Sequence, residues 1–291
     1  MSGSIPALAL RSPLAQIPAA VIADPARDRV HPARNDQLLL PSQGVGMNAL
    51  FLRAAGQGRR PTMLLLHGLP GNERNLDLAQ AVRRAGWNVL TFTYRGAWGS
   101  PGTFSIAGAI EDADAALSFL RSPDAAARYN VDAERIVVAG HSMGGLAAAL
   151  LARRGRPVHG IVLIDAWNAA LVGDELVRNG PQWRSQFEAS MDLGHSLNGA
   201  TPASLADEIA AHRTDWNLMD AAPALARGQV LNVYATHGGA AENRALTAAI
   251  HGLGGADLTV VEIETDHSFT DRRIALAGVV VSWLDELETV D

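Results

Sequence analysis

The sequence predicts an α/β domain in which a mostly parallel sheet is covered by helices on both faces. From about Gln37 onward, short apolar runs alternate with amphipathic helical stretches. This rhythm is typical of parallel strands joined by helices. A second observation is the junction Gly140-His141-Ser142-Met143-Gly144, where an apolar run gives way at once to an Ala/Leu-rich helical pattern. Such a strand–turn–helix junction is expected at the carboxyl edge of a parallel sheet.

Each element is expected from its local pattern. Aliphatic runs bounded by Gly, Pro or polar residues predict strands, and apolar residues spaced three and four apart predict helices. The expected strands are Leu38–Leu40, Met47–Arg53, Thr62–His67, Asn88–Tyr94, Arg135–Ala139, Gly160–Asp165, Gln229–Ala235 and Leu258–Ile263. The expected helices are Leu76–Ala85, Ile106–Leu120, Met143–Arg154, Asn243–His251 and Asp271–Leu287. No helix separates the first two strands, so we expect them to form an antiparallel hairpin.

Residues 1–36 are rich in Pro, Ala and Arg, and we interpret them as a poorly ordered or surface-hugging arm. Residues 37–291 then form the domain. One insertion, at about 167–228, interrupts the strand–helix rhythm and carries Trp183 and Phe187 in helix-like surroundings. Loops that leave the carboxyl ends of parallel strands surround the ligand site, so we interpret this insertion as a helical lid.

Composition excludes several function classes. The chain of 291 residues carries a net charge of −6, which gives no reason to expect nucleic acid or an anionic membrane as partner. No apolar run approaches the roughly 20 residues that span a bilayer. Cysteine and lysine are both absent, which excludes thiolate chemistry, Schiff bases and a P-loop lysine. Oligomeric state is open, and so is the choice between cytoplasm and periplasm.

Ser142 has the features of a catalytic nucleophile. A sharp turn between strand and helix forces the serine into a strained backbone, and the residues two before and two after it must be small. Gly140 and Gly144 meet this requirement. The serine hydroxyl is then exposed at the N-terminus of the following helix, which ends at Gly155.

A serine hydroxyl needs a base to take its proton at neutral pH. The best candidate is His267, in a loop between the final predicted strand and the C-terminal helix. That loop lies at the same sheet edge as Ser142. Acyl transfer also needs hydrogen-bond donors for the developing oxyanion, and the backbone N–H groups of Leu69 and Met143 are the candidates.

Four segments together resemble the α/β-hydrolase superfamily. They are His67-Gly68-Leu69-Pro70-Gly71, Tyr94-Arg95-Gly96-Ala97-Trp98-Gly99-Ser100, Gly140-His141-Ser142-Met143-Gly144-Gly145 and Asp266-His267-Ser268-Phe269. The likeness covers roughly residues 45–290 and is greatest to bacterial serine hydrolases of the dipeptidyl-aminopeptidase and acylaminoacyl-peptidase-like type. The resemblance implies a Ser-His-acid triad, an acyl-enzyme intermediate and no cofactor.

The sequence departs from the superfamily pattern at the acid. The carboxylate usually follows the strand that corresponds to Gln229–Ala235, but here that strand runs into a Gly- and Ala-rich segment that contains His237. Asp165 is the favoured acid, since some lipases of the superfamily carry theirs after the preceding strand. Glu242 is the alternative, unless it caps the helix that follows it. The third possibility is a Ser-His dyad with no acid.

The expected activity is hydrolysis of a carboxylic ester with a small to medium apolar acyl group. An aminopeptidase-like amide hydrolase is less favoured, because such enzymes need an acidic anchor for the substrate's amino group and commonly carry a propeller domain. A low-turnover binding module on the same fold, or acyl transfer to an alcohol, are the other hypotheses. No histidine cluster has metal-ligand spacing, so no metal is expected. We expect a structural role for Arg95 and place Trp98 as a candidate for the acyl pocket.

Overall fold

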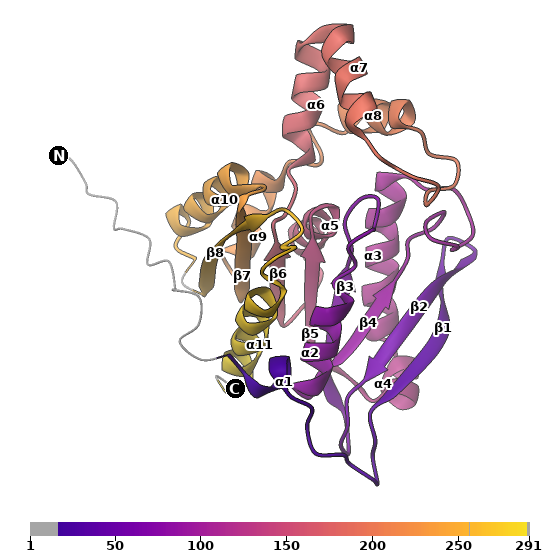
Figure 1. Cartoon of the computed structure of the whole chain (residues 1–291), viewed down its shortest axis with the longest axis vertical. Coiled ribbons are helices and arrows are strands. Elements are labelled where there is room, and N and C mark those ends of the chain that lie inside the picture. The colour runs from indigo at the N-terminus through magenta and orange to yellow at the C-terminus, as the bar shows by residue number, and fades with distance from the viewer. Residues whose placement is uncertain (1–16, 256, 290–291) are drawn as a thin grey trace, which may run out of the picture.

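The computed structural model describes residues 17–255 and 257–289. Within this part of the chain, the strands form one sheet in the order β1-β2-β4-β3-β5-β6-β7-β8, with helices on both faces (Figure 1). The strands are β1 (Arg34–Ser42), β2 (Val45–Arg53), β3 (Arg60–Leu66), β4 (Asn88–Phe92), β5 (Val131–His141), β6 (Gly160–Ile164), β7 (Val230–His237) and β8 (Leu258–Asp266). The helices are α1 (Ala19–Ile22), α2 (Leu76–Arg84), α3 (Ile106–Leu120), α4 (Pro123–Tyr129), α5 (Met143–Arg153), α6 (Ala169–Arg178), α7 (Gly180–Ser190), α8 (Pro202–Ala211), the 3₁₀ turn η1 (Leu218–Ala221), α9 (Ala222–Leu225), α10 (Ala240–Gly252) and α11 (Arg273–Thr289).

The sheet confirms the predicted fold class and the N-terminal hairpin. β1 pairs antiparallel with β2, and β2 pairs antiparallel with β4. From β4 to β8 every neighbouring pair is parallel. The carboxyl ends of β3, β5, β6, β7 and β8 therefore meet at one edge, and the loops that leave this edge are brought together whatever their separation in sequence.

Two apolar layers lie on the two faces of the sheet. On one face, α3 and α5 pack over side chains such as Leu64 and Val138. On the other, α2 and α11 pack over side chains such as Met63 and Val137. Successive strand residues thus alternate between the two layers, which is why the central strands read as continuous apolar runs.

Two short helices were not expected from the sequence. In α4, Pro123 occupies the first turn and the Ser122 hydroxyl accepts a hydrogen bond from the Ala125 N–H, so the local signal was present but brief. α1 lies in the segment interpreted as an arm, of which residues 1–16 fall outside the described residues. The guanidinium of Arg84 on α2 donates to the Ala20 carbonyl at 2.6 Å, which ties α1 to the domain. β1 begins at Arg34, just before the expected domain boundary at 37.

The insertion between β6 and β7 folds as α6, α7, α8, η1 and α9. Figure 1 shows α6, α7 and α8 standing beyond the sheet on the side where β6 ends. The carboxylate of Glu208 on α8 accepts hydrogen bonds from the backbone N–H groups of Ile106 and Ala107, at 3.0 and 2.8 Å. These are the first residues of α3, whose unpaired N–H groups favour a carboxylate. The insertion is therefore attached to the body of the domain at a helix N-terminus.

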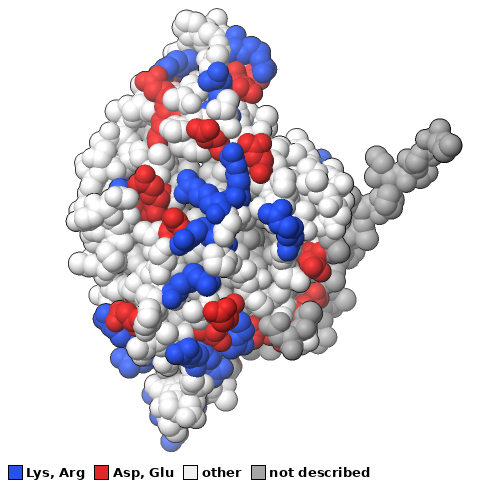
Figure 2. Space-filling model, turned by 180° about the vertical axis from the view of Figure 1, so that it is seen from behind, with Lys and Arg blue, Asp and Glu red and all other residues white. Residues whose placement is uncertain are grey.

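Charges of both signs share the face opposite that of Figure 1. Figure 2 shows arginine side chains gathered near the middle of this face with carboxylates beside them. Asp114 on α3 pairs with Arg156, which follows α5, at 2.7 Å, and Arg153 on α5 pairs with Asp220 in η1 at 3.6 Å. Among the described residues, no helix has the length and apolar character needed to cross a membrane.

Candidate active site

Ser142 occupies the tight junction between β5 and α5 that the sequence predicts. Its backbone angles, φ 56° and ψ −116°, are strained for a residue with a side chain. The Ser142 N–H donates to the Ile164 carbonyl at 3.0 Å, and its own carbonyl accepts from the Trp167 N–H at 3.1 Å. Both partners flank the end of β6. Hydrogen bonds from the end of β6 to both the N–H and the carbonyl of Ser142 thus hold the serine in its strained conformation.

Glycine is required on both sides of this serine. A Cβ at Gly140 would lie 2.1 Å from the Gly144 carbonyl oxygen, and a Cβ at Gly144 would lie 2.4 Å from that of Leu66. Neither backbone contact can relax without moving a strand or the start of α5. The spacing predicted from the motif is therefore a steric necessity of this turn.

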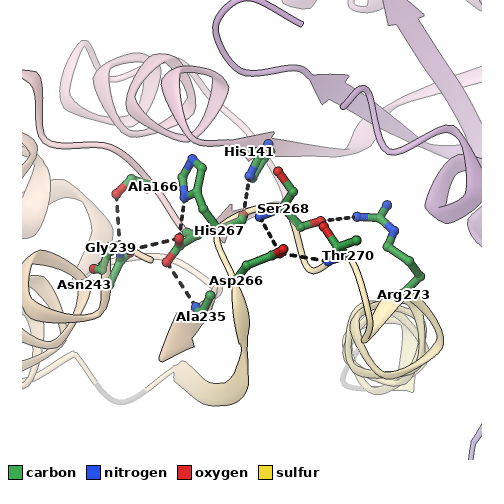
Figure 3. Close-up of polar contacts among 11 residues, drawn as sticks. His141, Ala166, Ala235, Gly239, Asn243, Asp266, His267, Ser268, Thr270 and Arg273 are labelled. Atoms are coloured by element: carbon green, nitrogen blue, oxygen red, sulfur yellow. Dashed lines mark hydrogen bonds and ion pairs between the residues drawn. The ribbon is translucent and has the colours of Figure 1, made fainter. Parts of the chain in front are cut away.

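His267 lies in the loop between β8 and α11, and its ring meets a buried carboxylate (Figure 3). Its Nδ1 donates to Oδ2 of Asp165 at 2.5 Å. Asp165 is fully buried, whereas the side chain of His267 is half exposed. This geometry leaves Nε2 as the ring nitrogen that can accept a proton. Of the candidate acids, Asp165 is the one that the fold brings to the histidine.

The segment in which the superfamily acid was expected supports Asp165. Oδ1 of Asp165 accepts from the Ala235 N–H at 3.1 Å, and Oδ2 accepts from the Gly239 N–H at 2.9 Å. A Cβ at Gly238 would come within 2.1 Å of Oδ2. The end of β7 and the residues after it thus provide donors and empty space for a carboxylate that follows β6. The His237 side chain is exposed.

Asn243 on α10 joins the two loops that surround this carboxylate. Its buried side-chain amide donates to the carbonyls of Ala166, at 3.0 Å, and Gly239, at 2.8 Å. The segment after β6 and the segment after β7 are therefore held together next to Asp165. Sequence reasoning assigned no role to this residue, since an Asn in a helical pattern carries no signal for such a bridge.

Glu242 lies in the first turn of α10, close to the Asp165 carboxylate but not in its place. Burial raises the pKa of Glu242, the Asp165 charge raises it further, and a hydrogen bond from the Asn168 N–H and the nearby His267 oppose this rise. Its position in the first turn also suits the helix dipole. Asp266, adjacent to His267 in the chain, instead accepts backbone hydrogen bonds from Ser268 and Thr270 and shapes the loop.

His141 contacts His267 from the end of β5, as Figure 3 shows. Its Nε2 donates to the His267 backbone carbonyl at 2.8 Å, and the two rings lie 4.8 Å apart. Burial lowers the pKa of His141 to about 4, and the nearby His267 lowers it as well. His141 is therefore neutral at physiological pH, and its hydrogen bond holds the loop that carries His267.

The loop after β3 lies directly against Ser142. A Cβ at Gly68 would approach the Ser142 Cβ to 2.9 Å, so this loop and the start of α5 share one site. His67 is buried, its Nδ1 donates to the Gly68 carbonyl at 2.7 Å, and burial lowers its pKa to about 4. The loop therefore has a rigid base. Leu69 follows within the loop, and Met143 is the first residue of α5, where backbone N–H groups have no helical partner.

Arg95 and Trp98, in the loop after β4, take different positions. The Arg95 guanidinium pairs with the buried Asp112 at 2.6 Å and with Glu111 at 2.7 Å, as the expected structural role requires. The Trp98 ring is 39% exposed, and its indole N–H donates to the Pro70 carbonyl at 2.8 Å. Among the described residues, no three His, Asp or Glu side chains come together as metal ligands.

Comparison with known proteins identifies the family. The model of the alpha/beta hydrolase family matches residues 63–283. The chain belongs to this family. Its recognition from four sequence segments is thereby confirmed.

Individual relatives cover parts of this alpha/beta hydrolase. It is 35% identical over 120 residues to the alpha/beta hydrolase domain-containing protein WAV2 of Arabidopsis thaliana. The matched segment covers 40% of this chain and 37% of that protein. The chain spans less than half the length of the curated relatives it matches. Among solved structures, acylaminoacyl peptidase of Pyrococcus horikoshii superposes with a TM-score of 0.61 at 11% identity, over 87% of this chain and 41% of that one. Brefeldin A esterase, a bacterial homologue of human hormone sensitive lipase, superposes with a TM-score of 0.59 at 20% identity, over 91% of this chain and 78% of that one. These structural similarities show a shared fold.

Proposed function

We propose that this alpha/beta hydrolase is a serine esterase that cleaves a carboxylic ester of a small to medium apolar acyl group. The observation that carries the proposal is the 2.5 Å hydrogen bond between His267 Nδ1 and the buried Asp165, at the sheet edge that also carries the Ser142 turn. A strained serine, a histidine with one nitrogen held by a carboxylate, and a donor-rich loop are the parts that acyl transfer needs.

The proposed reaction has two halves. Nε2 of His267 takes the proton of the Ser142 hydroxyl as its oxygen attacks the ester carbonyl. The backbone N–H groups of Leu69 and Met143 stabilise the resulting oxyanion. His267 then gives its proton to the leaving alkoxide, and an acyl-enzyme remains. In the second half, His267 activates water, which releases the carboxylic acid and restores the serine.

Asp165 holds the imidazole in the required tautomer and stabilises the imidazolium that forms in each half. Two backbone N–H groups, of Ala235 and Gly239, donate to its carboxylate in addition to His267 and hold it in place. The helical insertion would act as a lid, since α6 follows directly from the strand that carries this acid. Its Trp183 and Phe187 rings stack on each other with centroids 5.5 Å apart, and would give this lid an apolar surface.

Labelling with a fluorophosphonate, followed by intact mass, tests the nucleophile. We expect one adduct per chain on the wild-type protein and none on Ser142→Ala. Absence of labelling in a folded sample would contradict an activated serine and would favour a binding module.

The acid and the substrate class need separate measurements. Asp165→Asn is expected to lower kcat by about 10⁴-fold if the histidine loses its tautomer, whereas Glu242→Gln leaves kcat nearly unchanged. p-Nitrophenyl esters of rising chain length report the acyl preference, and aminoacyl p-nitroanilides test the amide alternative. A maximum at acetate, with no hydrolysis beyond butyrate, would contradict an apolar acyl site.

A further inference from the structure

A groove of about 660 Å³ is lined by none of the proposed catalytic residues. It is bounded by the β1–β2 hairpin, by the end of β4 and by the segment that leads into α2. Its volume falls in the range of sites for small ligands. Trp98 joins it to the loop after β3, because its indole N–H donates to the Pro70 carbonyl.

Arg74 is the one charged side chain among the described residues that line this groove. The neighbouring carboxylates interact with Arg273 instead. Glu73 lies 3.5 Å from the guanidinium of Arg273, and Asp77 accepts two hydrogen bonds from it. Within the described residues, the contact that remains for the Arg74 guanidinium is the Trp98 ring, whose centroid lies 5.3 Å away. The groove therefore contains a positive charge with no carboxylate partner in residues 17–255 and 257–289.

Large apolar side chains surround this charge and are exposed to solvent. Leu39 on β1 is 69% exposed, Leu76 at the start of α2 is 41% exposed, and Trp98 is 39% exposed. Leu38 and Leu40, on either side of Leu39, point to the opposite face of the sheet and pack into the core. Leu39 is thus left exposed on the other face of the hairpin. Apolar side chains grouped around the N–H donors of the Arg74 guanidinium are complementary to a ligand with an alkyl chain and an anionic end.

We propose that this groove binds an amphiphilic carboxylate. Its carboxylate group would accept hydrogen bonds from the Arg74 guanidinium, and its alkyl chain would lie over Leu39, Leu76 and the Trp98 ring. The uncharged polar residues of the lining, Asn48 and Thr93 among them, leave the site without a competing negative charge. The proposal does not depend on turnover at Ser142.

Isothermal titration of the full chain with decanoate tests this site. We use the Ser142→Ala variant, so that binding is measured without catalysis. Arg74→Gln is expected to weaken decanoate binding at least tenfold, which corresponds to 1.4 kcal/mol. The matched control is Arg59→Gln, which removes an exposed arginine outside the groove and should leave binding unchanged. Thermal unfolding monitored by circular dichroism checks that each variant is folded.

A second pair of variants tests the apolar part. Leu39→Asp places a negative charge in the groove and should abolish decanoate binding, whereas Leu253→Asp changes a similarly exposed leucine after α10 and should not. Decanol and decyltrimethylammonium are expected to bind at least tenfold more weakly than decanoate. Equal binding of decanol, or equal loss in both members of either pair, would overturn the proposal, and so would no decanoate binding to the folded parent.

Discussion

Gly238→Ala is expected to disable the site although it replaces none of the proposed catalytic residues. The added Cβ would lie 2.1 Å from Oδ2 of Asp165 and 3.1 Å from the Cα of His267. An ordinary contact with the carboxylate oxygen requires these groups to separate by more than about 1 Å, and the densely packed surroundings of Asp165 resist that movement. Misplacement of about 1 Å at a reacting centre costs roughly 10²-fold in rate. Complete loss of the His267 orientation would lower the rate by about 10⁴-fold. We therefore expect kcat to decrease by a factor between about 10² and 10⁴.

The assay compares the rate of fluorophosphonate labelling and kcat for p-nitrophenyl butyrate in wild-type and Gly238→Ala proteins. Gly228→Ala is the control, because a Cβ at that exposed glycine has nothing within 4 Å. Both substitutions reduce the entropy of the unfolded chain equally, which leaves the contact with Asp165 as the difference between them. If Gly238→Ala labels and turns over at the wild-type rate, Asp165 is not held by this segment or is not needed. That result would refute the argument for a relocated acid.

Three further predictions concern stability. Ser142→Gly should raise the free energy of unfolding by about 1–3 kcal/mol, because glycine adopts the strained backbone of this turn at little cost. Urea unfolding of Ser142→Gly and of Ser142→Ala measures this difference, and an unchanged free energy would mean that the turn is not strained. His67 and His141 stay neutral in the folded state, with pKa values lowered from 6.5 to about 4, so the unfolded state binds more protons as pH falls from 6.5 toward 4. Each histidine should therefore lower the free energy of unfolding by about 2 kcal/mol between pH 8 and pH 5. His67→Gln and His141→Gln should each remove its own share of this loss. If the free energy of unfolding of a variant falls with pH as steeply as that of the wild type, the histidine is not held neutral in the folded state. Glu242→Gln should raise the melting temperature at pH 7, since burial and Asp165 raise the pKa of this carboxyl and destabilise its charged form; a lower melting temperature would indicate that the charge is needed.

Local patterns were sufficient to predict most of the fold. The strands and helices of the sheet follow from aliphatic runs and from apolar residues three and four apart, and α3 coincides with the expected Ile106–Leu120. Ser142 was recognisable because its turn imposes a steric rule on residues within two positions of it. α1 escaped prediction because its four residues show no full helical period, and it is held by contact with α2 and α11.

The acid was the part of the site that local patterns left open between Asp165, Glu242 and no acid. Its position depends on which strand ends lie beside each other, and that is a property of the parallel sheet rather than of any segment. β6 pairs with β7, and β7 with β8. This order brings Asp165 to His267 and places Gly238 where a side chain would collide with the carboxylate.

Sequence patterns with a short range therefore determined the α/β class, the tight turn at Ser142 and the loop position of His267, because backbone sterics and side-chain periodicity act over a few residues. The pairing of His267 with Asp165, the contact of His141 with the His267 loop and the position of Arg74 over the Trp98 ring were decided by the tertiary structure. Each of these depends on contacts between segments that are far apart in the chain. Such contacts are set by the packing of the sheet as a whole, and no single stretch of the sequence encodes them.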